Sequence, residues 1–192
     1  MPSLRDLAAG RQLGDHQAMD QDTLDWIIAN RPPSFPDRPA QPPHAPLLLI
    51  PPTDWFVDTR LADSIHGVLH SARVSVLASL LAGEHGLSRE ETTALSVAAA
   101  VHDCRRHHDR DDVGHGRRAA QWFAQHHETI SRAFGQQLPV GLITSAATAV
   151  ALHDVPYDAF SAEQVAAYEQ ARQFTDLLKA ADCLDRYRLP LD

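Results

Sequence analysis

Apolar residues recur every three or four positions through most of the chain beyond residue 60, which is the spacing of helices that bury one face. The pattern predicts helices over residues 62–83, 89–102, 116–134, 140–153 and 161–187. Ser88 and Glu91 have the spacing of a capping box, in which each side chain satisfies a backbone donor of the other residue. Because no segment alternates with period two for long enough to be a strand, we expect an all-α fold.

A proline-rich segment precedes this helical region. Nine of the 13 prolines lie between Arg31 and Phe56, and proline lacks the backbone donor that a helix interior or a central strand requires. We therefore expect an extended connector, in which Leu47–Ile50 packs on the following domain. A short amphipathic helix is predicted ahead of it, at Asp22–Ile28. The chain is thus divided into an N-terminal arm, residues 1–56, and a helical core, residues 57–192.

The composition is that of a globular protein with a buried core. The 192 residues include 44% hydrophobic and 22% charged residues. No apolar run approaches the roughly 20 residues that span a bilayer, and the first residues lack the layout of a secretory signal, so we expect a cytoplasmic protein without a membrane partner. A formal net charge of −8 argues against broad nucleic-acid binding. Cys104 and Cys183 are expected to be free thiols near the core, and a homodimer is compatible with the sequence.

Histidine is the informative residue type, with 12 copies in the chain. The predicted helices place His70, His102 and His153 on apolar stripes, and Asp182 also lies on an inward face. A single histidine on such a face is usually a hydrogen-bonded core residue. A buried carboxylate such as Asp103 or Asp182, however, costs several kcal/mol unless a cation or a donor accompanies it. Three histidines and two aspartates together favour a metal site, and imidazole with carboxylate suits iron, manganese, zinc or cobalt.

The order of these residues resembles the H…HD…D signature of the HD-domain superfamily of metal-dependent phosphohydrolases. The signature residues are His70, the doublet His102-Asp103 and Asp182. His115-Gly116 is similar to the HG element of that superfamily, and residues 181–185 are similar to its closing element. The resemblance covers about residues 62–188. It implies a compact HD-domain helical bundle, with the four signature residues as ligands of a first metal.

A second metal is a further expectation from the resemblance. In the dinuclear branches of the superfamily, two more histidines lie between the doublet and the last aspartate, and His115 and His153 hold those places here. Asp103, with two oxygens, could bridge both ions. The alternative for His115 is to orient water or phosphate. We expect one or two divalent ions per chain, iron or manganese first, with zinc, cobalt and nickel also compatible.

Arginines follow the doublet, as an anionic, phosphorylated substrate would require. Arg106 stands where many members of the superfamily have a lysine, and Arg105, Arg106 and Arg118 are the expected substrate contacts. The alternative is a solvated loop that is balanced by its own aspartates, Asp109, Asp111 and Asp112. The candidate acid and base groups of the reaction are His66, His107 (or its neighbour His108) and Asp103.

Three functions follow as hypotheses. The first is a hydrolase that cleaves a phosphate ester of a nucleotide or another small phosphorylated metabolite through metal-activated water. The second is a mixed-valent di-iron oxygenase that acts on a small anionic substrate, because the six ligands also have the order found in those enzymes. The third is a non-catalytic binding module, against which the intact ligand set argues.

Overall fold

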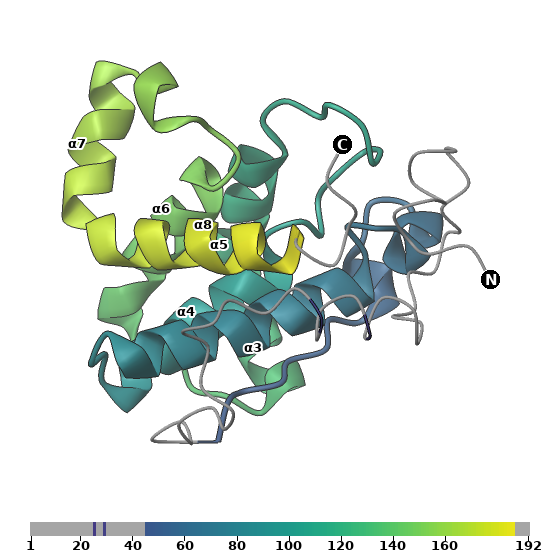
Figure 1. The fold of residues 1–192 in the computed structure, drawn as a ribbon, viewed down its shortest axis with the longest axis horizontal. Helices are drawn as coiled ribbons and strands as arrows, with labels where there is room; N and C mark the ends of the chain where they lie inside the picture. The colour runs from purple at the N-terminus through teal and green to yellow at the C-terminus, as the bar shows by residue number, and fades with distance from the viewer. Residues whose placement is uncertain (1–24, 26–28, 30–44, 187–192) are drawn as a thin grey trace.

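Helix α4 (Arg89–Val101) lies at the centre of a helical bundle in this computed structural model, which describes residues 25, 29 and 45–186. Every residue of α4 from Thr93 onward is buried. Around it pack α3 (Val68–Glu84), α5 (His115–Phe134), α6 (Val140–Leu152) and α8 (Arg172–Arg186), while α7 (Ala162–Gln170) lies at one side (Figure 1). Short 3₁₀ turns occupy Thr53–Trp55, Thr59–Asp63 and Tyr157–Ala159. The described part of the chain contains no strand, which confirms the all-α prediction.

Small residues allow the neighbours of α4 to come close. Ala98, Ala99 and Ala100 are fully buried, and Leu95 and Val101 fill the remaining space. The capping box at the start of α4 is present: the Ser88 amide donates to Glu91 Oε2 at 2.8 Å, and the Glu91 amide donates to Ser88 Oγ at 3.2 Å. The start of α4 is therefore fixed by its cap, and its C-terminal end carries the His102-Asp103 doublet.

Two predicted helix boundaries are wrong. The first helix begins at Val68 rather than at residue 62, because the chain doubles back just before it. A side chain at Gly67 would collide with the carbonyls of Leu61 and Ala62, so this turn requires glycine. His66 therefore lies in the turn and not on the helical stripe.

The last predicted helix is divided into α7 and α8 at Ala171, whose φ of −126° interrupts the helix. The bend lets the hydroxyl of Tyr168 donate to Asp176 Oδ1 at 2.9 Å. Tyr157 donates to the same oxygen at 2.7 Å, so Asp176 joins the 3₁₀ turn, α7 and α8. A continuous helix would separate Tyr168 from Asp176.

Residues 45–52 run in extended form along α3. The amide of Leu47 donates to Ser79 Oγ, and that of Leu49 donates to Ser75 Oγ, both at 3.1 Å. Leu49 is buried and belongs to the core, which confirms that this segment packs on the helices. Of the helix predicted near Trp26, only Asp25 and the following Ala29 are described, and both are helical; the remainder lies outside the described residues.

None of the helices in residues 45–186 combines the length and the apolar character needed to cross a membrane.

Candidate metal centre

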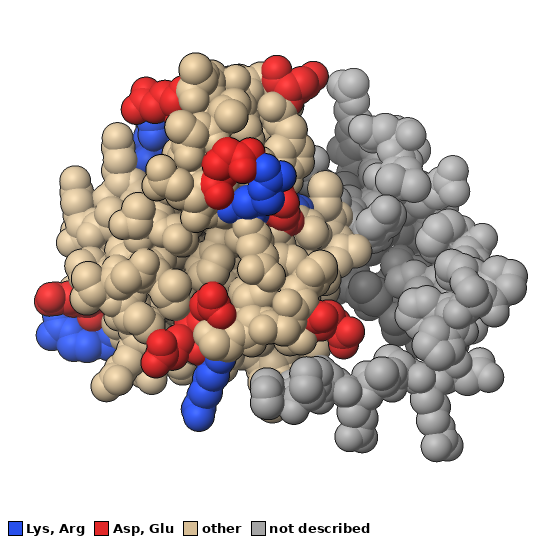
Figure 2. Space-filling model, turned by 90° about the vertical axis from the view of Figure 1, so that its left-hand side faces the viewer, with Lys and Arg blue, Asp and Glu red and all other residues tan. Residues whose placement is uncertain are grey.

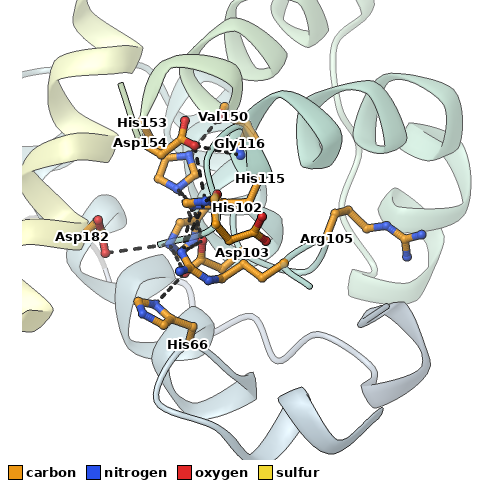
Figure 3. A network of polar contacts seen from close by, with 12 residues as sticks. His66, His102, Asp103, Arg105, His115, Gly116, Val150, His153, Asp154 and Asp182 are labelled. Carbon is orange, nitrogen blue, oxygen red and sulfur yellow. Dashed lines mark hydrogen bonds and ion pairs between the residues drawn. The ribbon is translucent and has the colours of Figure 1, made fainter. Parts of the chain in front are cut away.

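The six predicted metal ligands converge at one buried point (Figure 3). Most of them lie at helix ends, so the convergence of five helices brings together residues that are far apart in the sequence. His70 lies on α3, His102 and Asp103 follow α4, His115 begins α5, His153 follows α6, and Asp182 lies on α8. All six are buried, with at most 9% of each residue exposed.

One group of ligands surrounds Nε2 of His70. This atom lies 3.2 Å from Nε2 of His102, 3.3 Å from Oδ1 of Asp182 and 3.5 Å from Oδ2 of Asp103. Nε2 of His102 in turn lies 3.9 Å from the same Asp182 oxygen. Two imidazole nitrogens and two carboxylate oxygens thus face one small space.

A second group surrounds the other oxygen of Asp103. Oδ1 lies 3.0 Å from Nε2 of His115 and 3.4 Å from Nε2 of His153. The two Nε2 atoms are 3.0 Å apart. Asp103 therefore stands between two sets of ligands and presents one oxygen to each.

The four imidazoles share one orientation. In each ring, Nδ1 lies 2.6–2.7 Å from a fixed acceptor: Asp185 Oδ2 for His70, and the carbonyls of Ala99, Asp112 and Val150 for His102, His115 and His153. A carbonyl can only accept, so Nδ1 carries the proton in those three rings, and in a neutral ring the lone pair of Nε2 points inward. Metal-binding histidines are held in this way.

The inward arrangement is unfavourable unless positive charge lies within it. In neutral rings, the Nε2–Nε2 separations of 3.2 and 3.0 Å would bring lone pairs face to face, a repulsion that a proton or a cation relieves. Oδ1 of Asp103 is fully buried and accepts no hydrogen bond of acceptable geometry. A cation between these atoms would remove the repulsion. The buried histidine and aspartate groups therefore fit a metal ion.

The pKa shifts that neighbouring protein groups cause also favour positive charge at this site. Burial opposes charge on His70, yet Asp103, Asp182 and Asp185 outweigh it and raise its pKa to about 10. Burial likewise opposes ionisation of Asp182, but His70 and His102 bring its pKa below the ordinary value. For His102, burial dominates and lowers the pKa to about 4, so this ring is neutral, as a ligand must be. The site thus attracts positive charge and keeps a free imidazole.

Gly116 allows the second group to assemble. A Cβ at this position would lie 2.6 Å from the Val150 carbonyl, 2.6 Å from Asp154 Oδ1 and 2.9 Å from His153 Nδ1. Without a side chain, the first turn of α5 packs directly on the last turn of α6. The contact brings His115 next to His153. This close packing is a physical reason for glycine to follow His115 in the sequence.

The two histidines predicted as acid or base groups differ in position. His66 lines the cleft described below, and its Nδ1 lies 2.9 Å from Oδ2 of Asp103. The side chain is 23% exposed, so solvent and substrate can reach it. His107 is exposed and does not line the cleft; its backbone amide donates to Asp112 Oδ2 at 2.7 Å. His108 is exposed as well. Only His66 is placed beside the metal centre.

Of the three arginines predicted to bind substrate, only Arg106 faces the centre. Its Nη1 lies 3.0 Å from Nε2 and 3.4 Å from Nδ1 of His115 and 3.6 Å from Oδ1 of Asp103, while Nε and Nη2 donate to loop carbonyls. Arg105 points away (Figure 3) and donates to the Trp55 carbonyl at 2.9 Å. Arg118 donates to Asp112 at 2.6 Å. Neither Arg105 nor Arg118 lines the cleft. Both hold the loop through contacts within the protein, which agrees in part with the alternative prediction of a loop that is balanced by its own aspartates.

A cleft of about 970 Å³ opens onto the centre. Buried His70 and Asp103 and half-buried His66 line the cleft, and Val155, Pro156 and Ala159 add an apolar part to the lining. Figure 2 shows the side of the molecule on which α7 lies, where charged side chains form small groups of mixed sign on a mainly uncharged surface. Contacts with a ligand on this face would therefore depend on individual side chains.

Sequence reasoning missed two supporting residues. Asp185 accepts from His70 Nδ1 at 2.6 Å and from Arg73 Nε at 2.7 Å. It lies three residues after Asp182, and this helical spacing, which places both carboxylates on one face, is the sequence feature that indicates its role. Lys179, which is the only lysine in the chain, donates to the carbonyls of His153, at 3.1 Å, and Val155, at 2.6 Å. It thereby fixes the end of α6. The cysteines also differ: Cys104 is buried, whereas Cys183 is exposed rather than near the core.

Comparisons with models of protein families, with curated proteins and with solved structures gave no match.

Proposed function

We propose that this chain is a metal-dependent phosphohydrolase of the HD-domain type, which cleaves a phosphate ester of a nucleotide or another small phosphorylated metabolite. The observation that carries the proposal is the convergence of four anchored imidazoles and two carboxylates beside an open cleft. A site of this kind combines firmly held ligands with access for a substrate, as a catalytic metal requires.

The ligand arrangement supports two ions that share Asp103. His70, His102 and Asp182 would hold the first, and His115 and His153 the second. The mixture of imidazole and carboxylate favours iron or manganese. When bound, such ions supply an activated water and polarise a phosphoryl oxygen.

The remaining steps belong to side chains of the cleft. Arg106, fixed by its bonds to the loop, places a positive charge beside His115, where it would offset charge that develops on the phosphoryl group. His66 is held by Asp103 at the edge of the cleft and would donate a proton to the departing oxygen. Asp185 fixes the ring of His70 and so orients a ligand.

The test is metal analysis by mass spectrometry on protein purified without a chelating column, paired with a phosphate-release screen over nucleotides and sugar phosphates. We expect about two ions per chain, as in two-metal sites, and phosphate release that requires them. His153→Ala should then halve the metal content and abolish turnover, whereas His126→Ala, at an exposed position on α5, should change neither. A wild-type ratio near one would exclude the dinuclear site. Phosphate release that persists after complete metal removal would exclude the proposal.

A di-iron oxygenase is the second candidate, because four imidazoles and a shared carboxylate also suit a pair of irons. Anaerobic metal analysis distinguishes the two functions. Two irons per chain together with a product that forms only in the presence of oxygen would favour oxidation. Phosphate release under strictly anaerobic conditions would favour hydrolysis.

A further inference from the structure

The mouth of the cleft carries donors that the metal centre does not use. Its lining includes Arg110, Arg117 and Gln164 in addition to the residues of the centre. The side chains of Arg110 and Arg117 form no hydrogen bond or ion pair with the residues that the structure describes. In this respect they differ from the three nearby arginines that hold the loop. A ligand in the cleft would meet these groups before it reaches the metal centre.

Gln164 presents a fixed donor to the cleft. It is the third residue of α7 and closes a capping box, in which its Oε1 accepts from the Ser161 amide at 2.9 Å. Because the carbonyl end of the side chain is held, the NH₂ group keeps both protons available. The equivalent residue in the capping box of α4 is Glu91, whose negative charge a helix N-terminus favours. Glutamine at position 164 gives up that favourable charge and retains a donor.

Arg117 shows the same departure from helix stability. It is the third residue of α5, at the end of the helix where the macrodipole disfavours a cation. Its side chain is exposed and has no partner in the described part of the chain to compensate. Stability of the helix therefore does not account for this arginine, whereas an anionic ligand in the cleft would.

We propose that Gln164 and Arg117 form a second subsite at the mouth of the cleft, which binds an anionic, oxygen-rich group of the substrate other than the group at the metal centre. The substrate class is then a phosphorylated metabolite that carries a second phosphate. This proposal depends on the proposed function only for the group that reacts at the metal centre. Asp109 and Asp111 also line the mouth, so recognition depends on directed hydrogen bonds from the amide and guanidinium groups rather than on a positive field.

The test measures binding rather than turnover, by calorimetry on the manganese-loaded chain at low temperature. The probes are two matched pairs: fructose 6-phosphate with fructose 1,6-bisphosphate, and adenosine 5′-monophosphate with adenosine 3′,5′-bisphosphate. We expect at least one bisphosphate to bind about tenfold more tightly than its monophosphate, roughly the gain from a charge-assisted hydrogen bond. Arg117→Gln and Gln164→Glu should each remove this advantage and leave the monophosphate affinity within about twofold.

Neither variant should reduce the melting temperature, because Glu preserves the capping box and Gln removes an unfavourable charge. Matched controls are Arg132→Gln and Gln125→Glu, both exposed on α5, which should leave all affinities unchanged. Equal affinities within both pairs, or variants without effect, would overturn the subsite. A bisphosphate preference that these variants remove, in a protein that releases no phosphate, would retain the subsite and reject the hydrolase. Phosphate release by a protein that shows no bisphosphate preference would retain the hydrolase and reject the subsite.

Discussion

At the scale of single residues, Asp103 stands between the two groups of candidate metal ligands. Its two oxygens face different sets of imidazoles, and the side chain is 3% exposed. Burial opposes its ionisation, but the surrounding histidines, His102 foremost, hold its pKa well below the ordinary value. The carboxylate is thus ionised at neutral pH, and both groups of imidazoles face it.

Asp103→Asn should therefore remove both ions at once. The amide keeps the shape of the side chain but has a single acceptor oxygen and no charge, so neither position retains a sufficient ligand set. We expect metal content below about one tenth of wild type, consistent with loss of a shared ligand, and an unchanged helical signal by circular dichroism. Asp111→Asn, an exposed neighbour in the same loop, is the control. Full metal occupancy in Asp103→Asn would contradict the ligand assignment.

The six candidate metal ligands could be selected from the sequence because helical periodicity places three of the histidines inward and the resemblance to the HD-domain signature implies the rest of the set. His70, His102 and His153 fall on stripes that helices must bury, and helix ends bring them together. Helical periodicity gives no such signal for the loop arginines: the resemblance marks the position of Arg106, which faces the centre, but does not exclude Arg105, which turns back to Trp55. The role of a loop side chain depends on contacts that only the folded chain defines.

At the scale of elements, the junction between α5 and α6 holds His115 beside His153. Gly116→Ala places a methyl group within 2.6 Å of the backbone carbonyl of Val150, and backbone cannot move aside as a side chain can. We expect the first turn of α5 to shift outward, with loss of about 1–3 kcal/mol of the free energy of unfolding and of the metal held by His115 and His153. Urea denaturation and metal analysis measure the two effects.

Gly141→Ala is the matched control for this change. A Cβ at Gly141, in the first turn of α6, meets nothing within 4 Å, so alanine there should leave metal content unchanged and add up to about 1 kcal/mol of helix stability. Equal behaviour of the two variants would show that close packing of α5 on α6 is not required.

The extended segment beside α3 gives a second prediction at this scale. Ser75 Oγ accepts from the buried amide of Leu49 at 3.1 Å and donates to the Ala72 carbonyl at 2.7 Å. Ser75→Ala leaves that amide without an acceptor and should cost about 1–3 kcal/mol of unfolding free energy, measured by urea denaturation.

Ser71 supplies the control for this prediction, because its hydroxyl is buried on the same helix without a hydrogen-bond partner. Ser71→Ala should be neutral or stabilising. If the two alanine variants are equally stable, the segment contributes little to the fold.

The boundaries of the helices show what a sequence pattern alone cannot predict. The stripe through His70 extends back to residue 62, yet the helix begins at Val68 because Gly67 passes close to the carbonyls of Leu61 and Ala62. The division at Ala171 depends similarly on the bond from Tyr168 to Asp176. Both are contacts between segments, which periodicity along one segment cannot reveal.

At the scale of the whole molecule, the candidate metal centre joins five helices that elsewhere meet through apolar packing and a few polar contacts, such as those of Arg73 with Asp185 and of Lys179 with the carbonyl of His153. Ions that bind the folded chain and not the unfolded chain stabilise it by about 4 kcal/mol at a concentration a thousand times their Kd. We therefore expect a chelator to lower the melting temperature of the wild-type protein by about 8–16 °C, because 1 kcal/mol shifts the midpoint by about 2–4 °C in a chain of this size. Differential scanning fluorimetry measures the shift. Asp103→Asn should melt at the same temperature with and without the chelator, and a wild-type protein that does likewise would exclude a structural contribution of the metal.

The hydrogen bonds behind the imidazoles have a kinetic consequence. His102 and His153 each bond through Nδ1 to the carbonyl three residues earlier, so the ring and the last turn of its helix move as one unit. We expect an ion bound here to leave more readily when such a turn frays, because fraying releases the ring from its anchored orientation. The rate of metal exchange would then depend on the backbone as well as on the strength of the coordinate bonds.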